Sequence, residues 1–179
     1  YIHFVRYGWN GSRVSRWFQQ EVYEDFWLHV RNTDNTIKTC LARAGWHGDT
    51  KSGYYGHLTV AYNYENVKEP LEFSETCNVP FGTYEFFNLI GNFSTPSGRL
   101  MTLSSSFQGG KFYDGTRVTV SVSPSKSVSS NLEIGATYEL NAVDFPDRNQ
   151  EFTSHIGRFR FLAMLNTKFS ITAFTQYSN

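Results

Sequence analysis

The segment Leu132–Ala142 reads Leu-Glu-Ile-Gly-Ala-Thr-Tyr-Glu-Leu-Asn-Ala, and its apolar and polar side chains alternate without a break. Successive side chains of an extended strand point to opposite faces, so a period of two separates this segment into one apolar face and one polar face. The segment therefore predicts a long β-strand whose two faces meet different surroundings.

The same alternation occurs at Val118–Val122 and at Tyr54–Tyr64, while helical periodicity is almost absent from the chain. Proline and glycine punctuate the sequence between segments rich in β-branched and aromatic residues, as is typical of strands joined by turns. Around Ser154–Arg158 the alternation slips, which predicts a β-bulge. We predict ten strands, at residues 1–7, 13–30, 36–46, 54–66, 83–93, 99–109, 116–124, 131–142, 151–164 and 169–179.

The links between these strands predict how the strands are connected. Short, turn-like links fall at every second junction, and longer ones, Val67–Gly82 and Asp144–Gln150, fall between them. Short turns at one end and longer loops at the other are typical of outer-membrane barrels, whose tilted strands need about 9–11 residues. The expected fold class is all-β, an antiparallel up-and-down outer-membrane-type β-barrel. The short links are Gly8–Ser12, Gly48–Gly53, Thr95–Gly98, Pro124–Ser130 and Leu165–Lys168.

The amino-acid composition excludes several classes of protein. The chain has 179 residues, of which 17% are aromatic, and it carries 16 basic and 16 acidic residues. So many aromatic residues exclude a disordered chain, and the absence of a basic patch argues against nucleic acid as a partner. No run of 18 apolar residues is present, which excludes a membrane-spanning helix, whereas a membrane strand turns only alternate residues to lipid.

Aromatic residues often fall toward the predicted strand ends. Rings in these positions suit the girdles of a membrane barrel, and they suit the core of a β-sandwich equally well. The residues concerned are Tyr64, Tyr84, Phe107, Phe112, Tyr113, Phe152, Phe169 and Tyr177.

Several stretches together resemble a known family. Asn63–Ser74 followed by Val79–Phe86 is similar to its "Tyr-Glu-Arg-Leu, Pro-Phe-Glu-Ile, Ile-Pro-Pro-Gly-x-Tyr-x-Phe" pattern, and Gly110–Arg117 resembles its Gly-x-Phe-[Phe/Tyr]-Asp-Gly-x-Arg. Leu132–Phe145, Glu151–Arg160 and Phe174–Tyr177 resemble three further family segments in the same order. The pattern belongs to the DUF5916 family of bacterial proteins, in which a carbohydrate-binding family 9-like domain precedes a C-terminal β-barrel region.

The resemblance implies location in the bacterial outer membrane and a link to glycan handling. It covers most of the chain, best from Tyr54 to Asn179, but the carbohydrate-binding domain is absent, and the family continues with further strands beyond its Gln-Tyr segment. The sequence begins without an initiator methionine or a signal-peptide pattern, so we expect that it was either processed or is a fragment. We therefore expect 1–179 to be a single β-barrel region, an internal fragment of a longer chain.

No catalytic residue, metal or cofactor is expected. The five histidines have no zinc-ligand spacing, the serine clusters lack the Gly-x-Ser-x-Gly elbow, and Asp144–Glu151 does not follow the EF-hand spacing. The two cysteines, Cys40 and Cys77, form either a bridge or two unrelated thiols, and the sequence leaves both open.

Two groups of polar residues are candidates for function. Arg117, Glu133 and Glu139 alternate with apolar neighbours, so they are expected to face the lumen. Arg158 and Arg160 should join them, since a basic side chain facing lipid at mid-membrane costs about 2–4 kcal/mol. This ladder either sets pore selectivity or forms a charge-paired wall.

The Val67–Gly82 loop carries the second group, Glu69, Glu72 and Glu75. The loop is either an exposed recognition loop or an inward-folded plug.

Three hypotheses follow. The first is a structural or transport-related segment of an outer-membrane β-barrel, with the lipid bilayer, and a glycan or another outer-membrane protein, as partners. The second is a soluble β-sandwich or lipocalin-like module that binds carbohydrate or lipid. The third is an enzyme, which would need a converging carboxylate pair or a metal site in a pocket.

Overall fold

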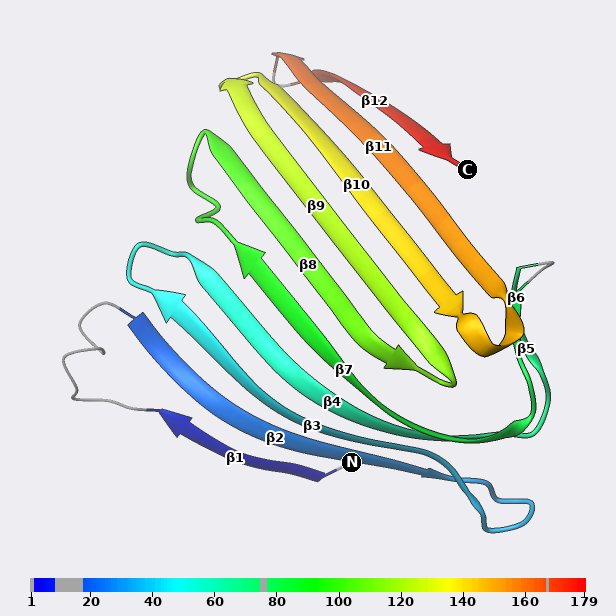
Figure 1. Ribbon diagram of the computed structural model, residues 1–179. Helices are drawn as coiled ribbons and strands as arrows, with labels where there is room; N and C mark the ends of the chain where they lie inside the picture. Colours follow the sequence, from blue (N-terminus) through cyan, green and yellow to red (C-terminus); the bar gives the residue numbers. More distant parts are fainter. Residues whose placement is uncertain (1, 9–17, 75–76, 167) are drawn as a thin grey trace.

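The computed structural model describes residues 2–8, 18–74, 77–166 and 168–179. Ten strands form one antiparallel sheet in the order β1-β2-β3-β4-β7-β8-β9-β10-β11-β12, and a two-stranded hairpin, β5–β6, is inserted between β4 and β7 (Figure 1). The elements are β1 Ile2–Gly8, β2 Phe18–Val30, β3 Ile37–Thr50, β4 Tyr55–Val67, β5 Leu71–Ser74, β6 Cys77–Val79, β7 Gly82–Ser94, β8 Met101–Phe112, β9 Gly115–Ser129, β10 Leu132–Phe145, the 3₁₀ turn η2 Pro146–Arg148, β11 Gln150–Asn166 and β12 Phe169–Ser178.

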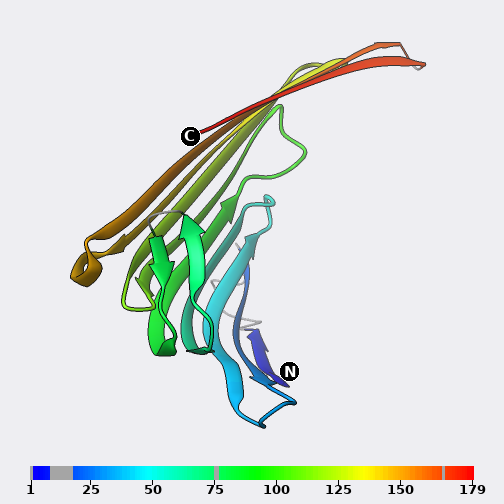
Figure 2. The same ribbon diagram turned by 90° about the vertical axis from the view of Figure 1, so that its right-hand side faces the viewer.

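The sheet is curved, twisted and open. Each main strand pairs with its neighbours along the chain, so the predicted all-β, up-and-down antiparallel arrangement is confirmed. Within the described residues no ladder joins β1 to β12, and these two strands form opposite edges of the sheet (Figures 1 and 2). A closed barrel is therefore not part of this arrangement.

All ten predicted strands are present, but two expectations about their details are wrong. Pro124–Ser130 is not a link, because β9 continues to Ser129. The ladder to β10 pauses between the pairs Gly135↔Ser125 and Tyr138↔Val122, next to Pro124, which lacks an N–H to donate. The bulge expected around Ser154–Arg158 is also absent, since β10 and β11 pair there without a shift.

The predicted difference in link length between the two ends of the sheet is due mainly to one link. The link at 68–81, which contains β5–β6, is long, whereas the link at 113–114 on the same end is only a tight turn. The opposite end carries the links 51–54, 95–100 and 130–131. The β1–β2 link, expected to be short, lies outside the described residues.

The two faces of the sheet differ in chemistry and in burial. Along β4, Thr59 and Ala61 are each 1% exposed on one face, while Leu58 and Val60 are 49% and 50% exposed on the other. We call the face with Thr59 the polar face and the face with Leu58 the apolar face. Sheet curvature encloses the polar face, so burial is the reverse of that expected in a water-soluble core.

The buried apolar cluster is small and lies at one end of the polar face. Hairpin residues Cys77 and Val79 contribute to it, and four main-sheet residues complete it, with Tyr84, Tyr113 and Phe152 packed at its edge. Among the described residues, this hairpin-end cluster holds most of the buried apolar side chains. Its main-sheet members are Phe86, Phe112, Val143 and Phe145.

Candidate functional site on the polar face

The apolar face carries a band of large exposed side chains. Most of the charged residues described on this face lie toward the strand ends: Glu85, Lys111 and Asp144 near the hairpin end, and Lys126 near the opposite end. Glu24 of β2 is an exception, because it is exposed on this face opposite Ala44, the β3 partner of Val60. The face alternates with the polar face along every main strand, as the period of two requires. Band residues include Leu58, Val60, Phe87, Leu89, Phe93, Phe107, Val118, Tyr138, Phe159 and Ile171.

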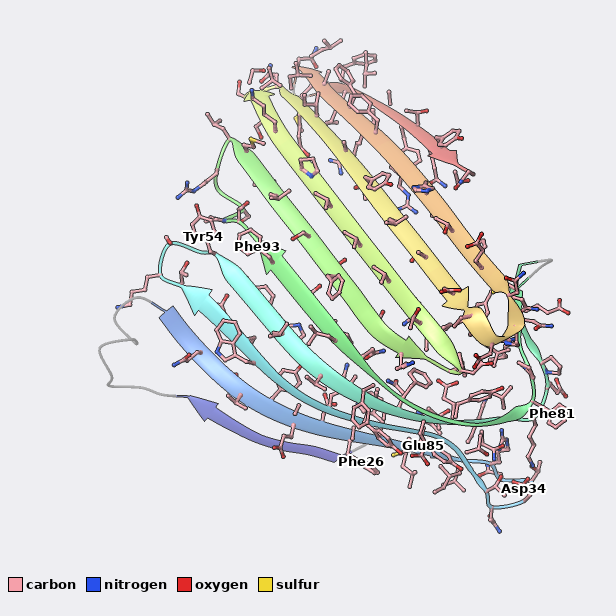
Figure 3. All side chains as sticks on the ribbon, viewed as in Figure 1. Phe26, Asp34, Tyr54, Phe81, Glu85 and Phe93 are labelled. Atoms are coloured by element: carbon pink, nitrogen blue, oxygen red, sulfur yellow. The ribbon has the colours of Figure 1, made fainter. Side chains whose placement is uncertain are left out.

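Aromatic rings also mark the end of the strands opposite the hairpin. Tyr54 and Phe93 lie side by side there, with ring centroids 6.3 Å apart (Figure 3). The guanidinium carbon of Arg99 lies 5.3 Å from the centroid of the Tyr54 ring. Tyr84, Phe112, Tyr113 and Phe152, by contrast, belong to the hairpin-end cluster on the polar face, so they are not part of a ring around the apolar face.

Four of the five predicted lumen residues form two cross-strand pairs on the polar face. Arg160 Nη2 lies 3.4 Å from Glu133 Oε1, and Arg158 Nη1 lies 3.6 Å from Glu139 Oε2. All four side chains are partly exposed, so each ion pair contributes only about 0–1 kcal/mol. Additional hydrogen bonds, from Asn141 to Glu139 and from Arg158 to Gln176, extend this ladder across three strands.

Arg117 shares the polar face but stands apart from the ladder. Its side chain packs over the ring of Phe112, with the guanidinium carbon 4.2 Å from the ring centroid. Within the described residues it forms no ion pair with Glu133 or Glu139. Arg117 therefore belongs to the hairpin-end cluster rather than to the two cross-strand pairs.

The predicted loop acids do not converge. Glu69 is exposed and helps to line a hollow of about 430 Å³ that also contains Arg31, Lys38 and Lys68. Glu72 is exposed on β5, opposite Asn78 of β6. Glu75 lies outside the described residues. The β5–β6 hairpin within this loop packs against the polar face of the sheet through Cys77 and Val79.

A hydrogen-bonded network of side chains from β2, β4 and β7 was not foreseen from sequence. The Tyr23 hydroxyl lies 2.6 Å from His57 Nε2 and 2.6 Å from Thr59 Oγ1, and Asn92 Nδ2 lies 3.0 Å from His57 Nδ1. Both ring nitrogens of His57 are thus engaged. These contacts tie His57 to side chains of β2, β4 and β7.

Two contacts between basic and acidic side chains extend this network. Asp25, only 7% exposed, accepts two hydrogen bonds from Arg43, at 2.8 and 2.7 Å. His47 Nε2 lies 3.3 Å from Glu21 Oε2 on the neighbouring strand. Alternation placed these residues on one face, but only the strand register shows which of them meet.

Beside the network, the polar face has a shallow, uncharged hollow of about 380 Å³. Serine residues make up most of its lining, which runs across β4, β7, β8 and β9. The polar face therefore has three zones in succession, namely the histidine network, the serine hollow and the charge ladder. The hollow is lined by Tyr55, Asn92, Phe93, Ser94, Ser104, Ser105, Ser106, Ser121 and Ser123.

Polar contacts at the strand ends include two perturbed ionisable groups. Burial and a 2.7 Å hydrogen bond to Glu65 raise the pKa of Tyr113 above its usual range. In the β2–β3 turn, hydrogen bonds from Lys68 and Thr36 hold the pKa of Asp34 below its usual range. Both groups stabilise links between strands.

Neither a metal site nor a disulfide is found among the described residues. No group of three histidine, cysteine or acidic side chains is placed to hold a metal ion in that part of the chain. Cys40 and Cys77 are separate free thiols, and burial raises the pKa of Cys77.

No helix in the described ranges has the length and apolar character needed to cross a bilayer.

Comparisons with protein-family models, with curated proteins and with solved structures give no match to this chain.

Proposed function

We propose that this sheet is part of the wall of a β-barrel in the bacterial outer membrane, with its apolar face toward lipid and its polar face lining the lumen. The observation that carries the proposal is the reversed burial along β4, where Leu58 and Val60 are exposed and Thr59 and Ala61 are enclosed. An uncovered apolar face of this extent is stable where the surroundings are themselves apolar.

The height of the apolar band supports this placement. On β10 the outward apolar positions run from Leu132 to Ala142, and Asp144 follows on the same face. At about 3.4 Å per residue this run is about 34 Å long, which a strand tilt of about 40° reduces to about 26 Å along the membrane normal. An outer-membrane barrel presents an apolar band about 25 Å tall.

The two open edges require partners in such a membrane, because unpaired backbone groups are costly in lipid. β12 is exposed along its whole length and offers one edge for further pairing. We propose that strands from a longer polypeptide complete the barrel, as the resemblance to the DUF5916 family implies. A structural or transport role linked to glycan handling would follow from the same relationship.

A soluble lipocalin-like or sandwich module is the alternative. A lipocalin-like module would need an apolar interior, yet the enclosed face here carries Thr59, Asn88 and Asp25. A sandwich would need a second sheet over the apolar face, and the second sheet in the described part of the chain is the short β5–β6 hairpin on the polar face. Both comparisons favour the membrane wall.

Detergent extraction of the full-length protein from bacterial membranes tests the proposal. A membrane barrel requires detergent for extraction, and its folded form migrates differently on a gel before and after boiling. If the full-length protein is instead recovered without detergent and stays monomeric, the membrane proposal is wrong, and glycan-binding assays become the next step.

A further inference from the structure

The β5–β6 hairpin lies across the polar face at one end of the sheet. Cys77 and Val79 are 1% and 0% exposed against Phe86, Phe112, Val143 and Phe145, which extend from β7, β8 and β10. On β5, Phe73 packs 5.5 Å from the ring centroid of Phe112. Figure 2 shows the hairpin in front of the lower ends of the strands. The hairpin therefore covers a part of the sheet that is built from strands far apart in the sequence.

Arg148 of η2 fastens the hairpin to two other links. Its Nη1 donates hydrogen bonds to the backbone oxygen and to Oδ1 of Asn78 on β6, and its Nη2 lies 2.8 Å from Asp114 Oδ1 in the β8–β9 turn. The guanidinium carbon lies 4.0 Å from the ring centroid of Phe145. One side chain thus joins the β4–β7, β8–β9 and β10–β11 links.

The hairpin is not needed to connect the wall. Val67 and Gly82, which flank its segment, are paired partners in the β4–β7 ladder. A two-residue turn could join partners at this spacing directly. The intervening residues therefore serve something other than connectivity.

From this placement we infer that the β5–β6 hairpin is a constriction at one mouth of the lumen, held in place by Arg148, which limits the size of solute that passes. This inference rests on the proposed barrel, since a constriction needs a lumen. The hairpin enters the enclosed face, where a solute would pass, and its apolar side packs on the wall. Glu72 is exposed on the hairpin, so in the proposed barrel it would lie at the passage.

The role of Arg148 in holding the hairpin against the sheet is tested first, by thiol labelling, which does not depend on pore activity. Full-length protein is treated with a water-soluble maleimide, and labelling at Cys77 is read by mass spectrometry of its peptide. Arg148→Ala should accelerate labelling by about tenfold or more, the change expected from losing a charge-assisted hydrogen bond. Arg99→Ala, which removes a ring-stacked arginine from the opposite end, should not. Equal rates of Cys77 labelling in the wild type and in Arg148→Ala would show that Arg148 does not hold the hairpin in place.

The constriction is tested by replacing residues 68–81 with Asn-Gly in the full-length protein and recording single-channel conductance in planar bilayers. A several-fold larger conductance supports the inference. If the wild-type protein forms a channel and the replacement has the same conductance, the constriction is wrong although the barrel is supported. A wild-type protein that forms no heat-modifiable membrane species overturns the barrel itself, and the constriction with it.

Discussion

Replacing Val60 with arginine places a charge at the middle of the apolar band. Val60 is 50% exposed and lies midway along the outward run from Gly56 to Tyr64 on β4. Four residues on either side give about 13 Å of strand at about 3.3 Å per residue, or about 10 Å of membrane depth at a tilt of about 40°. The side chain is therefore expected near the bilayer midplane.

A lipid-facing arginine at that depth costs about 2–4 kcal/mol, which lowers the folding equilibrium constant by about 30- to 1,000-fold. In a water-facing position the same substitution would change stability by about 0.5 kcal/mol or less. The assay is denaturant unfolding of the full-length protein in lipid vesicles, followed by tryptophan fluorescence and by gel migration before boiling.

Ser121→Arg provides the matched control. Ser121 lies on the polar face directly opposite Glu139, so a new arginine there gains an acidic neighbour and should be tolerated. The reasoning is refuted if Val60→Arg unfolds at the wild-type midpoint in vesicles, or if both substitutions destabilise the protein equally.

Two further predictions concern the links at the hairpin end. Because the pKa of Tyr113 is raised by burial and by the hydrogen bond to Glu65, its contribution to stability is complete below its ordinary pKa of about 10 and is lost as pH rises beyond that value. Tyr113→Phe should flatten this alkaline loss in unfolding curves between pH 8 and 11, roughly the range that brackets an ordinary tyrosine. Gly115→Ala should destabilise by about 1–3 kcal/mol, because an ideal Cβ there would lie 2.1 Å from the Asp144 backbone oxygen. Gly157→Ala, whose Cβ would meet nothing within 4 Å, should unfold like the wild type, and equal midpoints for the two variants would contradict the steric argument.

Alternation along the chain predicted the strands of the main sheet and, for the clearest of them, their two faces. The polar side of β10, with Glu133 and Glu139, could be assigned from period alone, because each neighbour in Leu132–Ala142 is of the opposite character. The β9–β10 turn was predicted too early because of Pro124. A proline is typical of a turn, but here it lies inside a long strand and only interrupts the hydrogen-bonded ladder.

Contacts between strands could not be predicted because they depend on register. Tyr23, His57 and Asn92 come from three strands, and no local spacing relates them. The β5–β6 hairpin was missed for a different reason. Its strands are short and contain both polar and apolar residues, and the flanking Pro70 and Pro80 are typical of a loop.

The docking of the hairpin also has a consequence for the order of folding. Each main strand pairs with a neighbour close in the chain, so those ladders close small loops and can form step by step. The contact from Asn78 to Gln150, by contrast, spans 72 residues and exists only after β7 to β11 have assembled. Protection of the Cys77 thiol during refolding should therefore be among the last events, and it would report that the wall beneath the hairpin is complete.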